Sequence, residues 1–327
     1  MKPYTQLTQG QRYQIRALIK AGFSQSKIAR VLDVHKSTIS REVRRNSGCK
    51  GYRPRQAHDK AVSRRYAAAK RIKMTPVMIE LITHYLRLDF SPEQVSGYLD
   101  REHNVKISHE TIYKHIRADK RNGGSLYRHL RRSNRKFRKR YGSKERHSRI
   151  ADQVSIDVRP AVVDARSRIG DWELDTITGK NSKGYLITAV ERKSKLTLIK
   201  RVPDKQSDRV ARAVIGLLRP YKDRVLTITS DNGREFARHI KISKSLRADV
   251  YFAHPYHAWE RGLNENTNGL LRQYFPKKMD FREIDDTSVE HAMNRLNNRP
   301  RKTLGFETPN RAFLKYSCDH DSVALAV

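Results

Sequence analysis

The spacing of apolar residues in this 327-residue chain changes at Gly170. Before Gly170 apolar side chains recur at helical intervals, whereas after it short β-branched segments predominate. These segments span residues 172–178, 185–191, 195–202 and 225–230, and an amphipathic helix over Ala211–Leu218 separates the last two. Three strands, a helix and a strand, followed by a further helix and strand, predict an α/β domain that opens with a hairpin. The chain therefore joins an all-α region to an α/β domain.

The first 50 residues have the pattern of a helix-turn-helix. A helix is predicted over 8–21 and a second over 24–32, where Ser24 is a candidate N-cap. Residues 33–35 interrupt the apolar stripe, which resumes over 36–45 opposite a polar face suited to a DNA groove. That face supplies the candidate DNA-binding residues, which are Lys36, Ser37, Thr38, Ser40, Arg41, Arg44 and Arg45. The alternative is an ordinary helical hairpin whose outer face is basic.

Residues 51–116 contain a second pair of helix signals. Ser91 caps and Pro92 opens one predicted helix, and another begins at Ser108. The separation from Asp100 to Lys106 is longer than a tight turn. A helical spacer that packs on a neighbour is therefore the alternative to a second helix-turn-helix.

Positive charge is concentrated in residues 1–150, which hold 37 Lys+Arg and 11 Asp+Glu, a net charge of +26. Residues 151–327 hold 32 Lys+Arg and 23 Asp+Glu, a net charge of +9. Such asymmetry is typical of proteins that bind a polyanion, because each neutralised phosphate releases counterions. DNA or RNA is the predicted partner, and a merely solvated basic surface is the alternative. The segment 117–160 is predicted to be a basic linker that lies along phosphates.

Other features disfavour several classes of protein. The longest largely apolar runs, 185–190 and 213–218, have six residues each, whereas a membrane span needs about 18. The N-terminus has no apolar segment typical of a secretory signal, so we expect a cytoplasmic protein. Cys49 and Cys318 are isolated, which favours neither a disulfide framework nor a cysteine-based zinc site.

Carboxylates are few among the predicted strands, so the exceptions are informative. Asp171, Glu173 and Asp175 alternate along one strand, and a period of two places all three on one face. Asp231 directly follows another strand, at the edge where open α/β sheets place their sites. Glu265 lies away from the apolar stripe of a predicted helix. Spacing does not choose among the first three, and a turn-forming Asp231 or a surface Glu265 remains the alternative for the others.

Three carboxylates from separate elements suit two hard divalent cations, because Mg²⁺ prefers oxygen ligands and keeps positions open for substrate phosphates. A two-metal phosphoryl-transfer site is therefore predicted. Arg261, Asn268 and Arg272 share the helix face of Glu265. Arg261, Arg272 and Lys277 are candidate phosphate contacts, with a solvated surface as the alternative.

Four segments of the sequence resemble the transposases of insertion sequence family thirty, in the DDE class: WELDT, TITSDNGREFA, HPYHAWERGLNENTNGLLRQYFPK and LNNRPRKTLGFETP. The resemblance extends from Tyr4 to about Tyr316. It implies that Asp175, Asp231 and Glu265 are the catalytic carboxylates, with 33 residues between the last two. Leu174 and Ala258 stand where the family has Gly and Ser, and neither is a carboxylate.

The resemblance also implies a multidomain fold, in which an all-α helix-turn-helix region precedes an α/β ribonuclease-H-like catalytic domain with a mixed sheet. The predicted parts are a helix-turn-helix domain over 1–50, a second helical region over 51–116, a basic linker over 117–160, the catalytic domain over 161–316 and a tail over 317–327.

The implied reaction is cleavage at the ends of an insertion sequence and joining of the freed 3′-hydroxyls to target DNA. Asp175 would bridge two Mg²⁺ ions, for which Mn²⁺ is a substitute, and Asp231 and Glu265 would each complete one of them. The expected partners are double-stranded DNA and further copies of the chain, at the nucleoid of a bacterium. Two rivals remain: a repressor without enzymatic activity, and a nuclease or ribonuclease H of the same architecture. His254 and His257 either lie near the site or serve packing.

Overall fold

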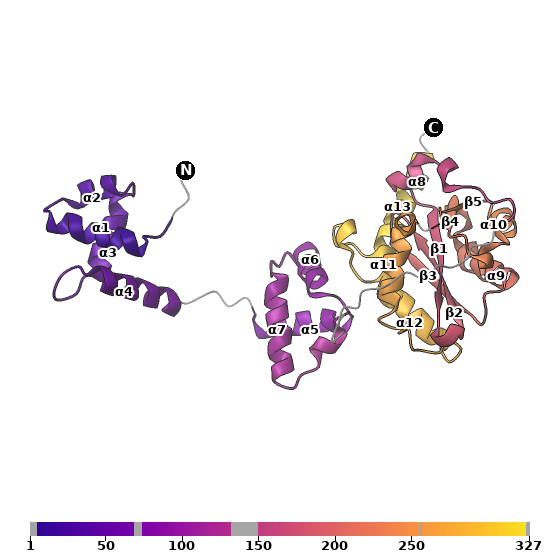
Figure 1. Ribbon diagram of the computed structural model, residues 1–327, viewed down its shortest axis with the longest axis horizontal. Coiled ribbons are helices and arrows are strands. Elements are labelled where there is room, and N and C mark those ends of the chain that lie inside the picture. Colours follow the sequence, from indigo (N-terminus) through magenta and orange to yellow (C-terminus); the bar gives the residue numbers. More distant parts are fainter. Residues whose placement is uncertain (1–4, 69–73, 132–149, 256, 325–327) are drawn as a thin grey trace. The chain divides into compact units, whose positions relative to one another are not determined.

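The computed structural model describes residues 5–68, 74–131, 150–255 and 257–324. Contacts divide the chain into two compact units, Met1–Lys73 and Met74–Val327. The first unit is helical, and the second contains a small helical bundle and a sheet with helices on both faces (Figure 1). None of the helices in these ranges is long and apolar enough to span a membrane.

The first unit contains the predicted helix-turn-helix. Its helices are α1 (Gln9–Lys20), α2 (Gln25–Val31), α3 (Lys36–Asn46) and α4 (Pro54–Ala67). Thr8 and Ser24 cap α1 and α2 by accepting hydrogen bonds from the amides of Gln11 and Lys27. Ile15, Ile28 and Ile39 are fully buried and join the first three helices.

Helix α4 belongs to this unit, so the unit extends beyond the predicted boundary at residue 50. Tyr52 and Ala57 are buried in the same core as the helix-turn-helix. The hydroxyl of Tyr52 donates to Glu42 Oε1 at 3.0 Å, and Arg12 Nε donates to the same oxygen at 2.7 Å. The boundary moves because the segment after residue 50 completes this core.

The second unit begins with a bundle of three helices, α5 (Pro76–Arg87), α6 (Pro92–His103) and α7 (His109–Arg121). Ser91 and Ser108 cap α6 and α7, as the sequence predicts. Residues 104–108 connect them, since α6 continues past Asp100 and ends at Asn104 in the left-handed conformation. Leu126, in the 3₁₀ turn after α7, is buried in the bundle core. The basic linker therefore starts later than residue 117.

Helix α6 is docked on the segment 300–311 of the same unit. Gln94 Nε2 donates to the carbonyl of Pro300 at 2.7 Å, and Lys302 pairs with Glu93 at 2.7 Å. A Cβ atom at Gly97 would lie 2.4 Å from ring atoms of Phe306, so only glycine permits this close approach. These contacts explain why the helical bundle belongs to the same compact unit as the sheet.

The sheet has five strands in the order β3-β2-β1-β4-β5. They are β1 (Asp171–Thr178), β2 (Tyr185–Glu191), β3 (Thr197–Val202), β4 (Thr227–Ser230) and β5 (Asp249–Phe252). β1 pairs with β2 and β2 with β3 antiparallel, whereas β1 pairs with β4 and β4 with β5 in parallel. The sheet is therefore mixed and begins with a hairpin, which confirms the predicted fold class.

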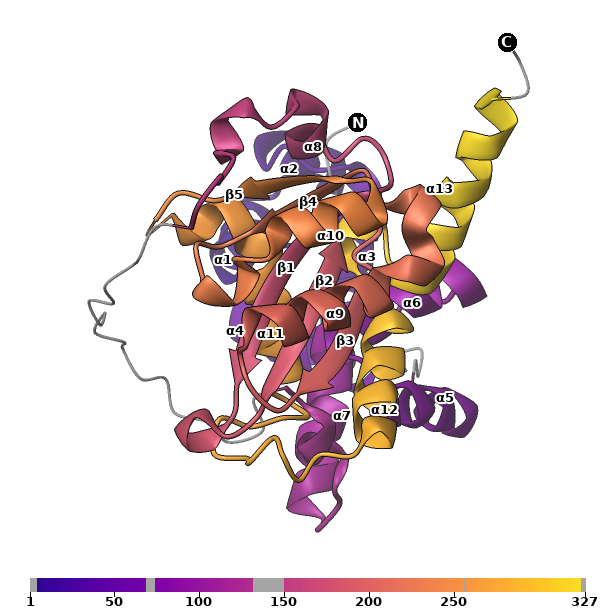
Figure 2. The same cartoon turned by 90° about the vertical axis from the view of Figure 1, so that its right-hand side faces the viewer.

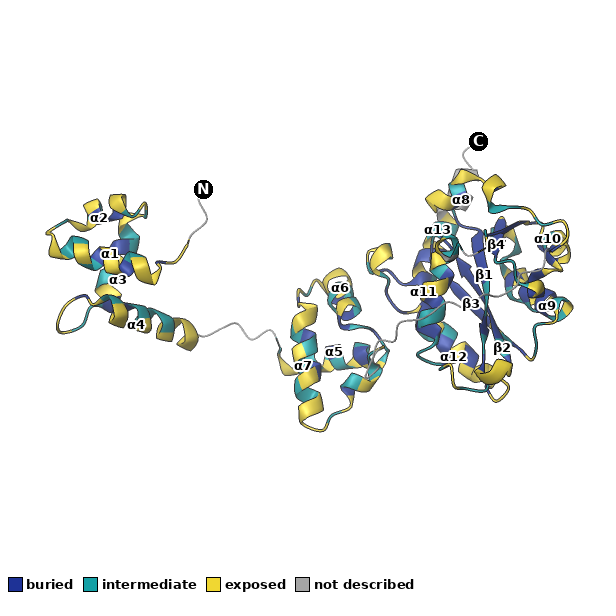
Figure 3. Cartoon of the chain, viewed as in Figure 1, coloured by how far each residue is buried: buried dark blue, intermediate teal, exposed yellow. Residues whose placement is uncertain are grey.

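Helices cover both faces of the sheet. Helices α9 (Ser207–Leu218) and α10 (His239–Leu246) pack on the face that carries Trp172 and Leu174, and Figure 2 shows them in front of the strands. Helices α11 (Gly262–Leu271) and α12 (Asp286–Asn297) pack on the opposite face. The strands are accordingly buried almost throughout (Figure 3).

Two further boundaries differ from those predicted from the sequence. Ser155 pairs with Phe252, and Phe252 N donates to the carbonyl of Val154 at 2.9 Å, so the end of the predicted linker lies against β5 of the sheet. Helix α13 (Pro309–Ala324) runs through most of the predicted tail. The short α8 (Ala161–Ala165) precedes the sheet. The Arg and Lys residues of the linker between 132 and 149 lie outside the described residues.

Candidate active site and nucleic-acid interface

The register of the sheet places Asp175 beside Asp231. In the parallel ladder Asp171 pairs with Thr227 and Glu173 with Thr229. The same offset, continued by two residues, sets Asp231 at the end of β4 against Asp175 in β1. The two carboxylates thus meet on neighbouring strands although they are far apart in sequence.

Arg261, which directly precedes α11, joins these two carboxylates. Its terminal nitrogens lie 3.5 Å from Asp175 Oδ1 and 3.3 Å from Asp231 Oδ2. Only 15% of its side chain is exposed, and Nε and Nη1 are buried without a hydrogen bond among the described residues. The guanidinium thus supplies positive charge between two acids that would otherwise repel each other.

Further donors fix the orientation of both acids. Asn268 Nδ2 donates to Asp175 Oδ2 at 2.6 Å, and the amide of Thr176 donates to Oδ1 at 2.9 Å. The amide of Gly233 donates to Asp231 Oδ1 at 3.0 Å. Burial raises the pKa of Asp175 and the charge of Asp231 adds to the rise, while Arg261 opposes it.

Glu265 lies on α11 between Arg261 and Asn268, on the helix face that those two residues share. It is exposed and makes no hydrogen bond or ion pair among the described residues. The structure therefore brings Asp175 and Asp231 together and places Glu265 on an adjacent helix. It does not gather all three carboxylates around one point.

The structure distinguishes the three acids of β1, which the sequence pattern alone does not. Asp171 is fully buried and accepts from Arg168 at 3.1 Å and from Thr227 Oγ1 at 2.8 Å. Glu173 is also fully buried and accepts from Arg192 Nη1 at 2.6 Å. Asp171 and Glu173 are therefore both hydrogen-bonded inside the protein, and Asp175 is the acid of β1 with an accessible oxygen.

Glu173 has a positioning role that the sequence did not reveal. Its Oε2 accepts a hydrogen bond from the amide of Asn264 at 3.2 Å, in the first turn of α11. A carboxylate satisfies unpaired amides and complements the dipole at a helix N-terminus. β1 therefore holds the start of the helix that carries Glu265.

The other predicted phosphate contacts of the catalytic domain have different surroundings. Arg272 donates to the carbonyl of Thr178 at 2.9 Å and lies 5.5 Å from the ring centroid of Phe281. Its described contacts are thus within the protein. Lys277 is exposed on the segment that follows α11.

His254 and His257 form a cluster with Glu260, next to Arg261. His254 Nδ1 lies 2.8 Å from Glu260 Oε1, and His254 Nε2 lies 3.0 Å from Asp157 Oδ2. His257 Nδ1 lies 3.2 Å from the same Glu260 oxygen. Since both nitrogens of His254 face carboxylates, this residue links the turn at Asp157 to the segment that carries Arg261.

This link predicts a pH effect. Hydrogen bonds to Glu260 and Asp157 raise the pKa of His254. Its contribution to stability is therefore fully present below the ordinary histidine value of about 6.5 and is lost as the pH rises through the raised pKa. We expect Glu260→Gln to lower the midpoint of thermal unfolding at low pH and to have a smaller effect at high pH. The exposed Glu290→Gln is the control. If Glu260→Gln lowered the unfolding midpoint equally at low and high pH, His254 would not be protonated at low pH as this argument requires.

The predicted DNA-binding face of α3 is largely exposed to solvent. Lys36, Ser40, Arg41, Arg44 and Arg45 are exposed, whereas Ser37 and Thr38 are half-buried. His35 caps the helix, because its Nδ1 accepts from the amide of Ser37 at 3.2 Å. The face can present basic side chains to DNA.

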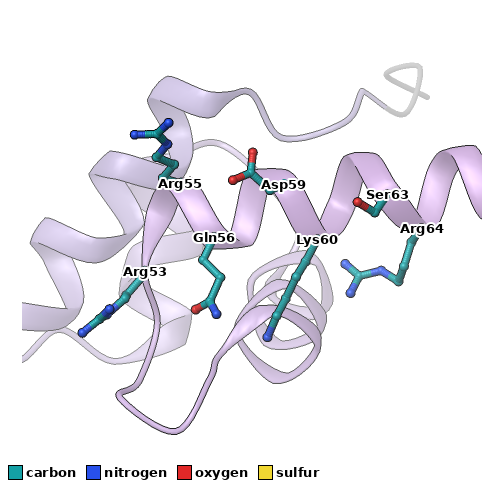
Figure 4. A pocket seen from close by; sticks show the side chains of 7 residues that line it. All are labelled: Arg53, Arg55, Gln56, Asp59, Lys60, Ser63 and Arg64. Atoms are coloured by element: carbon teal, nitrogen blue, oxygen red, sulfur yellow. The ribbon is translucent and has the colours of Figure 1, made fainter.

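Helix α4 adds a basic cavity beside the end of α3, which the sequence analysis did not predict. The cavity has a volume of about 680 Å³. Arg53, Gln56 and Lys60 extend to one side of α4, whereas Arg55 and Asp59 extend to the other (Figure 4). Lys60 Nζ donates to the carbonyl of Ser47 at 3.2 Å. The recurrence of Arg and Lys along 53–65 is the signal that could have identified this surface.

Two family models match stretches of the chain. A model described as "Helix-turn-helix domain" matches residues 3–46, and one described as "Integrase core domain" matches residues 166–258. A crystal structure of the catalytic core domain of BIV integrase is 24% identical with a TM-score of 0.37, and the match covers 47% of this chain and 97% of that chain.

Relatives match nearly the whole length of the chain. The transposase for insertion sequence element IS4351 of Bacteroides fragilis is 42% identical over 322 residues, which cover 98% of each chain. The transposase InsI for insertion sequence element IS30A of Escherichia coli (strain K12) is 38% identical over 93% of this chain and 82% of the relative. The chain therefore belongs to the IS30 family of DDE transposases, with a helix-turn-helix domain ahead of a ribonuclease-H-like integrase core.

Proposed function

We propose that this transposase binds the terminal inverted repeats of an insertion sequence, cleaves its ends and joins the 3′-hydroxyls to target DNA by two-metal phosphoryl transfer. The observation that carries this proposal is the pair of carboxylates formed by Asp175 in β1 and Asp231 directly after the neighbouring β4, beside the helix of Glu265. Carboxylates at the carboxyl edge of strands are typical of ligand sites in α/β sheets.

Asp175, Asp231 and Glu265 fit Mg²⁺, with Mn²⁺ as a substitute, by the chemistry of their donors. All three offer hard oxygen ligands. The place between Asp175 and Asp231 already accepts positive charge, since the guanidinium of Arg261 lies there. The chemistry that such ions supply is activation of the attacking oxygen and stabilisation of the leaving one.

The residues of the chain prepare this site for DNA. Asn268 orients Asp175, and Glu173 holds the first turn of α11 in place. Glu265 is exposed, so its side chain is available to turn toward the aspartates. Arg261, once released from the carboxylates, would hold a phosphate of the DNA, and Arg272 and Lys277 would provide further basic contacts.

A strand-transfer assay tests the proposal, using duplexes with the element's terminal repeats, a target plasmid and Mg²⁺ or Mn²⁺. We expect joined products that disappear with EDTA and with a scrambled terminal sequence. Cleavage without joining would indicate a nuclease, and end binding without cleavage would indicate a regulator. Size-exclusion chromatography with light scattering on the DNA complex tests the expected homo-oligomer.

Recognition of the ends is assigned to α3, and Arg41 provides the test. Arg41→Ala is expected to reduce the preference for end DNA over random DNA by roughly 5- to 150-fold, because a good bidentate base contact contributes about 1–3 kcal/mol. Competition binding at fixed salt measures this preference. Arg55→Ala, on α4, is the matched comparison and should weaken binding of end DNA and of random DNA equally. An unchanged preference in Arg41→Ala would remove this residue from base recognition.

A further inference from the structure

A second basic cavity lies in the catalytic domain, beside α11. Its volume is about 230 Å³, and its lining includes Arg166, Lys195, Arg301, Thr267 and Thr303 together with Gly262 at the start of α11. None of the described residues that line it is acidic. The lining positions of α11 face away from Arg261, Glu265 and Asn268 on the helical wheel, so the cavity is distinct from the candidate active site.

The cations of this cavity form no ion pair among the described residues, although the charges of Glu173 and Glu191 act on Lys195. Arg166 is exposed, and its side chain makes no hydrogen bond or ion pair within the described part of the chain. Arg301 donates to the carbonyl of Leu296 at 3.1 Å, while its Nε is buried without a partner. Lys195 donates to the carbonyl of Arg192. Three positive side chains thus converge in one cavity, where Lys195 and Arg301 donate to neutral carbonyls.

The energetics of these side chains also favour an anion. Burial and the neighbouring charge of Arg166 lower the pKa of Lys195 to about 8. Burial and Arg299 lower the pKa of Arg301 to about 10. Arg166 and Lys195 adopt the left-handed backbone conformation, with φ of 52° and 65°. This conformation is unfavourable for most residues other than Gly and Asn. Strained residues of this kind cluster at ligand clamps.

We propose that this cavity binds a phosphate group of the DNA backbone, on the side of α11 opposite the catalytic carboxylates. Convergent guanidinium and ammonium groups and two threonine hydroxyls are donors that phosphate oxygens prefer. Arg166, Gly262 and Thr303 are exposed, so a backbone phosphate can reach the opening. The assignment rests on the proposed function, because it takes DNA as the substrate held along α11.

Protection of Lys195 from acylation tests the site directly. A lysine with a pKa near 8 reacts readily at neutral pH, and a bound phosphate would both cover it and keep it protonated. The full-length chain is labelled with an acetylating reagent and analysed by mass spectrometry, alone, with millimolar inorganic phosphate, or with a saturating duplex. We expect duplex DNA to slow labelling of Lys195 at least fivefold more than labelling of Lys244, an exposed lysine on α10.

Equal protection of both lysines, or none, would overturn the proposal. Protection by inorganic phosphate without protection by DNA would also overturn it, since the site would then take a free anion. Strand transfer is measured on the same preparation. If the preparation carries out strand transfer while Lys195 stays reactive in the presence of DNA, only the proposed phosphate site is contradicted. If DNA protects Lys195 but no strand transfer occurs, only the proposed function is contradicted.

Substitutions supply the second test. Lys195→Asn and Arg166→Asn remove one charge each and suit the left-handed backbone. Arg247→Asn is the matched control, because Arg247 has a φ of 56° and does not line the cavity. For each cavity variant, the slope of log affinity against log salt concentration should decrease by about 0.9, the value for one phosphate contact. An unchanged slope in both cavity variants, or the same change in Arg247→Asn, would show that no backbone phosphate binds here.

Discussion

Asp175→Asn is expected to reduce strand transfer more than about 100-fold while leaving DNA binding intact. The substitution removes one anionic oxygen from the carboxylate that lies beside Asp231 and accepts from Asn268. Loss of a residue that merely orients a metal ligand costs 10- to 100-fold, so loss of the ligand itself should exceed that range. End cleavage and joining are quantified on labelled duplexes, and binding is measured by fluorescence anisotropy.

The matched control for this variant is Asp208→Asn. Asp208 is an exposed aspartate on α9 whose partners are Arg238 and Lys241. It undergoes the same chemical change outside the site, and near-normal strand transfer is expected. Strand transfer within a few-fold of wild type for Asp175→Asn would rule out a catalytic role for this acid. Asp231→Asn and Glu265→Gln extend the test to the other two carboxylates.

Glu42→Ala is expected to destabilise the first unit by about 3–5 kcal/mol, since it leaves a buried arginine without its counter-charge. The side chains of Arg12 and Glu42 are 4% and 9% exposed, and their closest atoms are 2.7 Å apart. The hydroxyl of Tyr52 would lose its acceptor as well. Hydrogen exchange of α1 and α3 amides should accelerate at least about 100-fold, and exchange in the five-stranded sheet should not change.

Both tryptophans, Trp172 and Trp259, belong to the second unit, so tryptophan fluorescence would miss this unfolding. Asp59→Ala, an exposed acid on α4, is the control for loss of charge alone. The double variant Arg12→Met, Glu42→Met should recover much of the stability, because it removes both buried charges. Slow exchange in Glu42→Ala would mean that the ion pair does not stabilise the core.

The sequence predicted those elements whose signals are local. The first four strands were located closely because β-branched residues are frequent in them and β-turn residues separate them. Thr8, Ser24, Ser91 and Ser108 marked helix starts, since each side chain accepts from an amide of its own first turn. Helix boundaries that depend on distant packing were less accurate.

Helix α4 shows why such boundaries are difficult to predict. Ala57 is its one buried residue, so the helix has almost no apolar stripe for a periodicity argument to detect. Its place is determined by Tyr52 and by contacts with helices that precede it in sequence. Helix α5 was not predicted either, although its apolar residues do follow a helical pattern.

The residues of the candidate site remain predictions from the sequence, and the contacts among them come from the structure. Period-two alternation placed three acids on one face of β1, and only the resemblance to a known family selected Asp175. The structure distinguishes Asp175 from the other two acids, which accept hydrogen bonds from Arg168 and Arg192. Arg261 was predicted as a phosphate contact. Its position between Asp175 and Asp231 depends on the parallel register of β1 and β4, which no local pattern encodes.

The acids of β1 also constrain how this strand can change in evolution. Successive side chains of a strand point to opposite faces. One residue inserted after Glu173 would turn Asp175 into the apolar layer of Trp172 and Leu174, while Glu173 still held α11. Substitutions within the strand leave this geometry intact, but an insertion or a deletion does not. A change in the length of β1 would therefore disturb the site more than a substitution outside its acids.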